Sequence, residues 1–353
     1  ATVWFLLYQY QGDDYGTIAM LIFAGMVISE VFSALFLSFL FRNWKTNGIK
    51  HAPLEQETVR QFFFIAFPVS ASALLGNAIS SAGSILLPKR LMVAGLSYEQ
   101  ALSALGVLSG MAMPLLLLPI ALVSSVCTAL LPAVTGAQAT GNDKRVQALV
   151  GRAITTVGLI AVPATAVLIP LAPKLSVLFF GQPLSAPYVS LLGATAVVCY
   201  YQMASGSLLN ALGLQHWNVV ISVGAELCQV ILMYRWCAFP WLGIYGYLIA
   251  MLFTGIAAFT LNFMILYRKV GFSLRPLRRF GVPLLCGATL FFWTRIFYQM
   301  FSQICHSDIA ALVCTVGGVG ILYIVVLRLM GIRLFYYLSK RMEKPYLPRL
   351  HMW

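Results

Sequence analysis

The sequence contains few charged residues for a chain of its length. Only 9% of its 353 residues are Asp, Glu, Lys or Arg, whereas 60% are hydrophobic, and the mean hydropathy is +0.87. A soluble protein of this size needs many more polar side chains to cover its surface, so the composition excludes that class. Apolar runs of about 20 residues, the length that crosses a bilayer, recur along the chain. They are continuous rather than alternating, which predicts an all-α polytopic membrane protein and not a β-barrel.

Enzyme motifs are also lacking. The sequence has no P-loop, so it carries no recognisable site for ATP hydrolysis. Its seven cysteines show no CxxC or other metal-binding spacing. Asp13 and Asp14 are adjacent, but no further carboxylate or His lies near them to complete a metal site. We therefore expect no enzymatic activity, no cofactor and no bound metal.

The apolar runs predict nine membrane-spanning helices, preceded by a helical stub at 1–9. The stub has no initiator Met and no features of a signal peptide, so we interpret it as the end of a longer helix. The third span is far longer than a bilayer requires and contains three prolines, so we expect a long, tilted and kinked helix there. The predicted spans are 17–41, 61–88, 101–136, 147–171, 186–212, 217–237, 241–267, 280–303 and 309–330.

The basic residues fix the orientation of these spans. If the loop after the first span is cytoplasmic, 18 of the 23 Lys and Arg residues lie on the cytoplasmic side, and Arg295 lies within a span. The outer side holds only Lys89, Arg90, Lys174 and Arg235. The net charge of +13 is therefore expected to face anionic lipid headgroups at the cytoplasmic surface, and no nucleic-acid partner is expected.

Polar residues form a stripe along the second predicted span. At 100° per residue, Ser70, Asn77, Ser81 and Ser84 share one helical face that leads to the pair Lys89 and Arg90. The stripe predicts either the lining of an aqueous cavity or a seam of small residues for helix packing. The cation pair lies on the outer side, where cations are scarce, and suits either a pyrophosphate or acidic sugar or a lipid-headgroup contact.

Several ionisable or polar residues lie inside other spans. Glu226 and Gln229 belong to a second polar stripe, while Glu30, Gln202 and Arg295 are placed in three further spans. A charged group in hydrocarbon must face a cavity, find a partner or lose its charge. These five residues are candidates for a cavity or ion-coupling site; the alternatives are structural hydrogen bonds and, for Arg295, an orientation toward the outer surface.

Three segments carry a resemblance to a known family: "ALGVLSGMAMPLLLLPIALVSSVCTALLPAVTGAQATGN" at 104–142, "GSLLNALG" at 206–213 and "LGIYGYLIA" at 242–250. They resemble the stage V sporulation protein B and polysaccharide-transporter branch of the multidrug/oligosaccharidyl-lipid/polysaccharide flippase superfamily, which is related to the lipid II flippases. The match runs from about residue 17 to the basic tail.

The resemblance implies a 14-helix plan of two six-helix lobes and an additional helix pair. Six predicted spans fall within one expected lobe and two beyond it, in agreement with that plan. On this plan the chain divides into the end of the N-terminal lobe at 1–41, a cytoplasmic linker at 42–60, the C-terminal lobe at 61–270, the additional pair at 271–330 and a basic cytoplasmic tail at 331–353.

The function that the resemblance implies is a flippase in a bacterial cell membrane. It would move a polyprenyl-pyrophosphate saccharide for peptidoglycan or polysaccharide synthesis by alternating access. Sodium or protons are candidate coupling ions. The segment "GVLSGMAMP" carries no Arg where the lipid II flippases have one, so their exact substrate does not transfer. The alternatives are a cation-coupled multidrug exporter of the same superfamily and a non-transporting scaffold of cell-wall synthesis.

Overall fold

The computed structural model describes residues 15–43, 56–272, 277–305 and 307–329. These residues form helices and contain no strand, which confirms the all-α prediction. The chain divides into two units, Ala1–Phe62 and Phe63–Trp353. The predicted stub 1–9 and tail 331–353 lie outside the described residues, as does most of the predicted linker 42–60. The first unit contains α2 (Tyr15–Asn43), whose apolar side chains are largely exposed, as on a helix that faces lipid or other helices.

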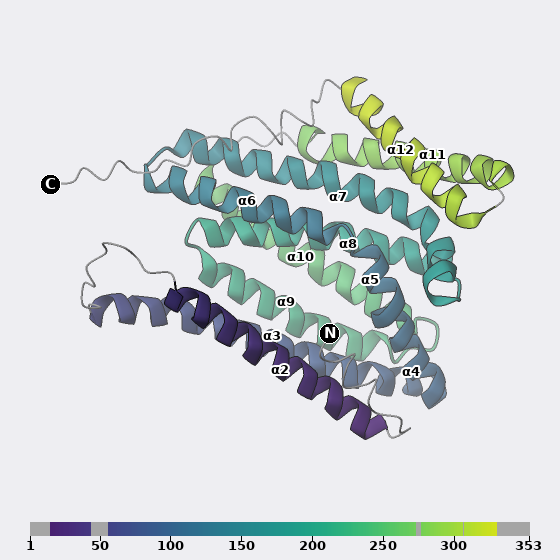
Figure 1. The fold of residues 1–353 in the computed structure, drawn as a ribbon, viewed down its shortest axis with the longest axis horizontal. Coiled ribbons are helices and arrows are strands. Elements are labelled where there is room, and N and C mark those ends of the chain that lie inside the picture. The colour runs from purple at the N-terminus through teal and green to yellow at the C-terminus, as the bar shows by residue number, and fades with distance from the viewer. Residues whose placement is uncertain (1–14, 44–55, 273–276, 306, 330–353) are drawn as a thin grey trace. The chain divides into compact units, whose positions relative to one another are not determined.

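A helix lies at each of the nine predicted spans (Figure 1). Seven of the described helices are long and apolar enough to cross a membrane, and together they make the chain a multi-pass membrane protein. The helices at 61–88 and 186–212 are not among the seven. The bounds from the second span onward are α3 (Gln56–Val93), α4 (Tyr98–Gly106), η1 (Val107–Ala112), α5 (Met113–Leu116), α6 (Ile120–Ala139), α7 (Asp143–Phe180), α8 (Ala186–Ala211), α9 (Gln215–Trp236), α10 (Ile244–Val270), η2 (Leu277–Gly281), α11 (Val282–Ile304) and α12 (Asp308–Leu329).

The prediction of one long kinked helix at 101–136 is wrong. The segment contains α4, the π-helix η1, the single turn α5 and then α6, which starts after a turn at 117–119. Pro119 has no N–H and cannot continue the ladder of backbone hydrogen bonds, so the helix breaks there rather than bending. The Ile120 N–H donates to the Leu117 carbonyl at 2.9 Å, and the Tyr200 hydroxyl donates to the Leu116 carbonyl, also at 2.9 Å.

α7, one of the two longest helices, has a recognisable cap at each end. α7 has 38 residues, extends beyond the predicted span 147–171 at both ends and retains three internal prolines. It begins where the Asn142 side chain accepts a hydrogen bond from the Arg145 N–H at 3.0 Å. It ends at Gly181, whose φ of 73° lies in the left-handed region that glycine adopts most readily.

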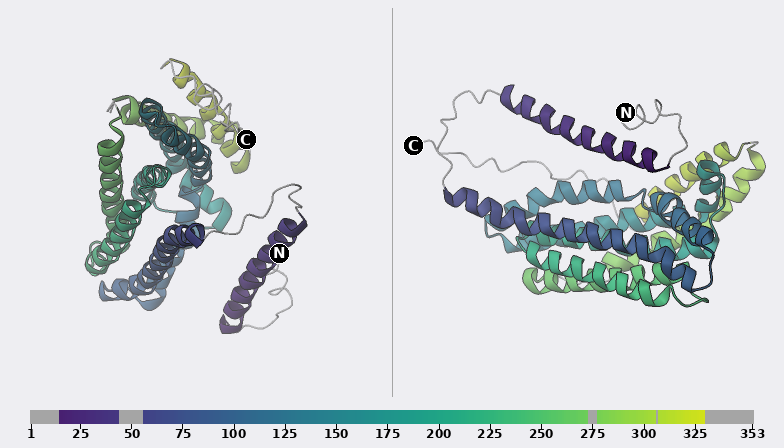
Figure 2. Two further views of the ribbon diagram at one scale, coloured as in Figure 1. Left: turned by 90° about the vertical axis from the view of Figure 1, so that its left-hand side faces the viewer. Right: turned by 90° about the horizontal axis from the view of Figure 1, so that it is seen from below.

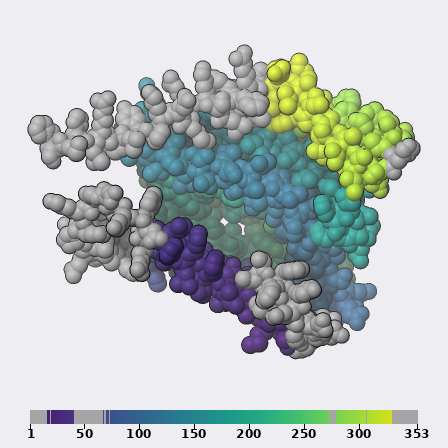
Figure 3. Space-filling model, viewed as in Figure 1, coloured from purple at the N-terminus to yellow at the C-terminus, as the bar shows by residue number. Residues whose placement is uncertain are grey.

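α7 lies at the centre of the second unit. It packs against α6, α8 and α11, while α10 packs against α8 and α9 (Figure 2). Most residues of α7 from Gly151 to Pro163 are buried. Apolar side chains from α6, α8 and α10 form a core around this helix. The α11–α12 pair lies beside α7, as the space-filling view shows (Figure 3), with Leu159, Cys286 and Leu327 buried between them.

Side chains rather than backbones join α3 to α9. A Cβ added at Gly76 would lie 2.9 Å from the Glu226 carboxylate, and one at Gly83 would lie 3.6 Å from Val230. Seven residues further along α3, Arg90 contacts Tyr234. These contacts are seven residues apart on α3 but only four apart on α9, about 10.5 Å against about 6 Å of helix length, so they do not define a pair of helices aligned along their length.

Candidate functional site

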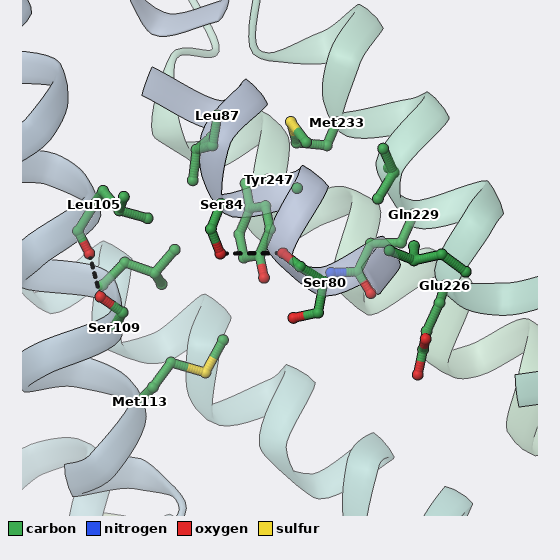
Figure 4. A pocket seen from close by; sticks show the side chains of 14 residues that line it. Ser80, Ser84, Leu87, Leu105, Ser109, Met113, Glu226, Gln229, Met233 and Tyr247 are labelled. Atoms are coloured by element: carbon green, nitrogen blue, oxygen red, sulfur yellow. Dashed lines mark hydrogen bonds between the residues drawn. The ribbon is translucent and has the colours of Figure 1, made fainter. Parts of the chain in front are cut away.

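A cavity of about 330 Å³ lies between α3, the α4–η1–α5 segment, α9 and α10. Figure 4 shows Ser80 and Ser84 on α3, with Ser109 to one side of them and Gln229 and Glu226 to the other. Tyr247 from α10 also lines the cavity, together with apolar side chains such as Leu87, Leu108, Met113 and Met233. The cavity is therefore a polar pocket within a bundle of apolar helices.

The α3 wall is formed by residues at helical spacing. Ser80, Gly83, Ser84 and Leu87 share one face, and the Ser84 hydroxyl donates to the Ser80 carbonyl at 3.1 Å. Ser84 was predicted to line a cavity. The other three members of that stripe, Ser70, Asn77 and Ser81, are exposed and do not line this pocket. Their role in headgroup binding stays a prediction.

The opposite wall contains the π-helix. Leu108 and Ser109 of η1 line the cavity, and the Ser109 hydroxyl donates to the Leu105 carbonyl at 2.8 Å. A π-helix inserts an extra residue into a helical turn and is frequent at functional sites, because it redirects side chains and frees backbone groups. Here it gives the wall a hydroxyl among apolar neighbours.

Glu226 is the ionisable residue of the cavity. It lies on α9 and is partly buried, and its Oε2 atom is inaccessible to solvent and has no hydrogen-bond partner among the described residues. The carboxylate sits against the backbone of α3 at Gly76, where the absence of a side chain leaves room for it. A buried carboxylate oxygen without a partner is costly, and a ligand or proton in the cavity would remove that cost.

Gln229 and Tyr247 extend the polar wall by one helical turn and across to α10. Gln229 lies three residues beyond Glu226 and therefore on the same side of α9. The side chains of Gln229 and Tyr247 both line the cavity. The structure thus brings together Glu226, Gln229 and Ser84, three residues that the sequence singled out on two different helices.

The predicted cation pair lies at the end of α3, outside the lining of this cavity. Lys89 is exposed. The Arg90 Nε donates to the Tyr234 carbonyl at 2.9 Å, and its guanidinium carbon lies 3.9 Å from the centre of the Tyr234 ring. Arg90 therefore joins α3 to α9 in this conformation, and its contact with a pyrophosphate stays a prediction.

Two further candidates of the second unit, Gln202 and Arg295, are not among the lining residues of the cavity. Gln202 of α8 faces α10, with its Oε1 3.8 Å from the position of a Cβ at Gly255. Arg295 is exposed on α11 and lies over the Phe291 ring, 4.8 Å from its centre. Glu30 is exposed on α2, in the first unit. Their roles in ion coupling stay predictions.

The lining can bind hydroxyl-rich or positively charged groups. Among the described residues it combines three Ser hydroxyls, one Tyr hydroxyl and one Gln amide with a single carboxylate, and none of these lining residues is Lys or Arg. Without a cation this wall offers no charge partner for a phosphate. The sequence did not indicate Ser80, Ser109 or Tyr247, although Ser109 lies in the Gly-Met-x-x-Pro helix that carries the family resemblance.

Comparisons with known proteins agree with a membrane-embedded helical protein of this class. The chain is 26% identical over 240 residues to stage V sporulation protein B of Bacillus subtilis (strain 168). The similarity covers 67% of this chain and 46% of that protein, so the chain spans about half the length of the curated relative it matches. This similarity agrees with the resemblance that the three sequence segments carry. No family model and no solved structure matches.

Proposed function

We propose that the chain forms part of a flippase-type transporter in a bacterial cell membrane and is not an enzyme. The observation that carries the proposal is the polar cavity with the buried carboxylate of Glu226, enclosed by helices of a multi-pass membrane protein. Polar groups at membrane depth are costly and typically mark a transport path. The similarity to stage V sporulation protein B supports the same class.

The substrate that we propose is a polyprenyl-pyrophosphate saccharide. The hydroxyl and amide groups of the cavity suit the sugar part of such a molecule, which has many hydroxyls and needs no cation. Its polyprenyl chain would remain among the lipids. The pyrophosphate would meet Lys89 and Arg90 at the outer end of α3, once Arg90 exchanges the Tyr234 carbonyl for a phosphate oxygen.

In alternating access, the cavity would open first to one side of the membrane and then to the other. Side chains of α9 contact α3 at Gly76 and Gly83, and Arg90 of α3 contacts Tyr234; such contacts can be exchanged without unfolding either helix. Glu226 is the candidate for coupling this motion to sodium or protons, because its buried oxygen lacks a partner. A cation-coupled drug exporter is the second candidate function, and the same carboxylate is the observation that favours it.

Reconstitution in vesicles with a fluorescent lipid-linked saccharide tests the proposal. The double substitution Lys89→Ala/Arg90→Ala is expected to reduce both headgroup binding and flipping. Arg235→Ala is the matched control, because Arg235 is another exposed cation near the predicted outer side. Thermal unfolding of each variant separates loss of the Arg90–Tyr234 contact from loss of substrate binding. Unchanged flipping in a folded double variant would remove the pair from the mechanism.

Flipping of a cationic dye instead of the saccharide would favour the exporter. A scaffold would be favoured by two results together: the wild type flips no saccharide, and Glu226→Gln loses binding to a partner protein of cell-wall synthesis.

A further inference from the structure

A second cavity, of about 560 Å³, opens at the end of the second unit where α4 and α10 begin and the chain turns from α7 into α8. It shares no lining residue with the cavity described above. All three of these chain segments lie on the outer side in the orientation that the basic residues predict. The lining residues come from 99–107, 183–188 and 244–245, so the site exists only in the folded bundle.

The rim of this outer cavity is polar. Glu99, Ser103 and Ser185 line it and are exposed. The position of Glu99 is fixed by a capping box at the start of α4, in which the Gln100 N–H donates to the Ser97 hydroxyl at 3.2 Å and the Ser97 N–H donates to the Gln100 side chain at 3.1 Å. In the described part of the chain, Glu99 is the one carboxylate of the lining and no Lys or Arg lines it, which argues against a phosphate or another anion.

The inner part of the cavity is aromatic. Tyr245 is partly exposed, and its ring packs edge-on against Tyr188, with 6.1 Å between ring centres and 72° between ring planes. Tyr188 is only 6% exposed, yet its hydroxyl has no hydrogen-bond partner among the described residues. Buried hydroxyls in folded proteins are nearly always paired, so one left unpaired beside a cavity indicates a missing ligand or water.

We propose that the outer cavity binds a neutral saccharide ring. An aromatic face packs against the C–H surface of a sugar, while a carboxylate and hydroxyls at the rim bond to the sugar hydroxyls. The Tyr188 hydroxyl supplies a further, buried partner. The site goes beyond the proposed transport path, because it is separate from the first cavity and binds on the predicted outer side. A soluble saccharide and the headgroup of a membrane glycolipid share this chemistry.

Binding of N,N′,N″-triacetylchitotriose, a soluble neutral trisaccharide, tests the inference. The purified protein is placed in phosphatidylcholine nanodiscs, and binding is measured by saturation-transfer NMR. Tyr188→Phe removes a single oxygen and is expected to weaken binding about 3- to 10-fold, the loss of one neutral hydrogen bond. Tyr245→Leu removes the stacking ring and is expected to weaken binding further. Tyr267→Phe and Tyr267→Leu, at an exposed position near the other end of α10, are the matched controls and keep wild-type affinity.

A competition experiment with a glycolipid identifies the source of the sugar. Competition by glucosyl diacylglycerol in the nanodiscs would show that a membrane headgroup occupies the site, and no competition would show that a soluble saccharide does. Equal affinity in the wild type, Tyr188→Phe and Tyr245→Leu, or no saturation transfer in the wild type at millimolar trisaccharide, would overturn the inference. The measurement involves no transport, so either result leaves the proposed flippase function to its own test.

Discussion

At the scale of single residues, Gly76 and Glu226 are matched to each other. The carboxylate occupies the space that a side chain at position 76 would take, 2.9 Å from the ideal Cβ. Because the end of a Glu side chain is flexible, a methyl group there would displace the carboxylate rather than unfold the helix. The glycine therefore sets where the carboxylate sits in the cavity.

Gly76→Ala is expected to slow transport several-fold while changing the free energy of unfolding by less than about 1 kcal/mol, since Ala also favours a helix over Gly by about that amount. Gly224→Ala on α9 is the matched control, because Gly224 is exposed, is not among the lining residues of the cavity, and would place its Cβ in open space. Transport rates and thermal unfolding of both variants give the comparison. Equal transport rates in the two variants would contradict the role of the Gly76–Glu226 contact.

Half of the cavity's polar lining was predictable from the sequence. Glu226, Gln229 and Ser84 stand out because polar residues are rare in apolar spans. Each of the three also belongs to a stripe of polar residues on one face of its own helix. Ser80 and Ser109 were not predictable, since their faces depend on how α3 rotates against α9 and on the extra residue in the π-helix turn. Tyr247 carries no signal of its own, because tyrosines are common in the chain and only packing distinguishes one from another.

At the scale of helices, the break between α5 and α6 needs a partner from another helix. The Ile120 N–H bonds to Leu117 instead of Leu116, and the Tyr200 hydroxyl of α8 donates to the Leu116 carbonyl. Prolines at 114 and 119 indicated an irregularity, but the sequence does not distinguish a kink from a break. That outcome depends on whether a distant hydroxyl is present to satisfy the carbonyl.

Tyr200→Phe is expected to destabilise the protein by about 1–3 kcal/mol, because it leaves the buried Leu116 carbonyl without this donor. Tyr201→Phe is an unusually close control: the next residue is also a buried tyrosine, but its hydroxyl has no hydrogen-bond partner among the described residues. Removing that hydroxyl should leave stability unchanged or raise it. Thermal unfolding in detergent measures both, and equal losses would contradict the assigned role of Tyr200.

At the scale of the whole molecule, hydropathy predicted where the helices lie, whereas the orientation that the basic residues indicate stays a prediction. Helices lie at all nine predicted spans because each run of apolar residues must satisfy its own backbone hydrogen bonds in lipid. The division into a lobe at 61–270 and an additional pair at 271–330 stays a prediction. The packing of α11 against α7 was not predictable, since it depends on small residues such as Gly287, where a Cβ would lie 2.8 Å from Val162.

Two cysteines test the predicted orientation. Cys237 and Cys305 follow α9 and α11, at ends that are predicted to face outward. Cys305 is partly exposed, whereas Cys237 is fully buried. A buried thiol is out of reach of a soluble reagent, so Cys237 should stay unlabelled.

In single-cysteine variants, a membrane-impermeant maleimide is expected to label Cys305 from the outside of intact cells and to leave Cys237 unlabelled. Labelling of Cys305 only after the inner membrane surface is exposed would show that the spans have the opposite orientation to the one predicted. Rapid labelling of Cys237 at pH 7 would contradict its burial.

The central claim is that the cavity between α3, η1 and α9 lies on the path of the transported headgroup. The most direct measurement is the flipping rate of a labelled lipid-linked saccharide by Ser84→Leu and by Ala82→Leu in vesicles. Ser84 lines the cavity, whereas Ala82 is exposed on the same helix and does not line it. The account predicts that Ser84→Leu, which fills the cavity, abolishes flipping and that Ala82→Leu retains it. Undiminished flipping by a folded Ser84→Leu variant would contradict the claim.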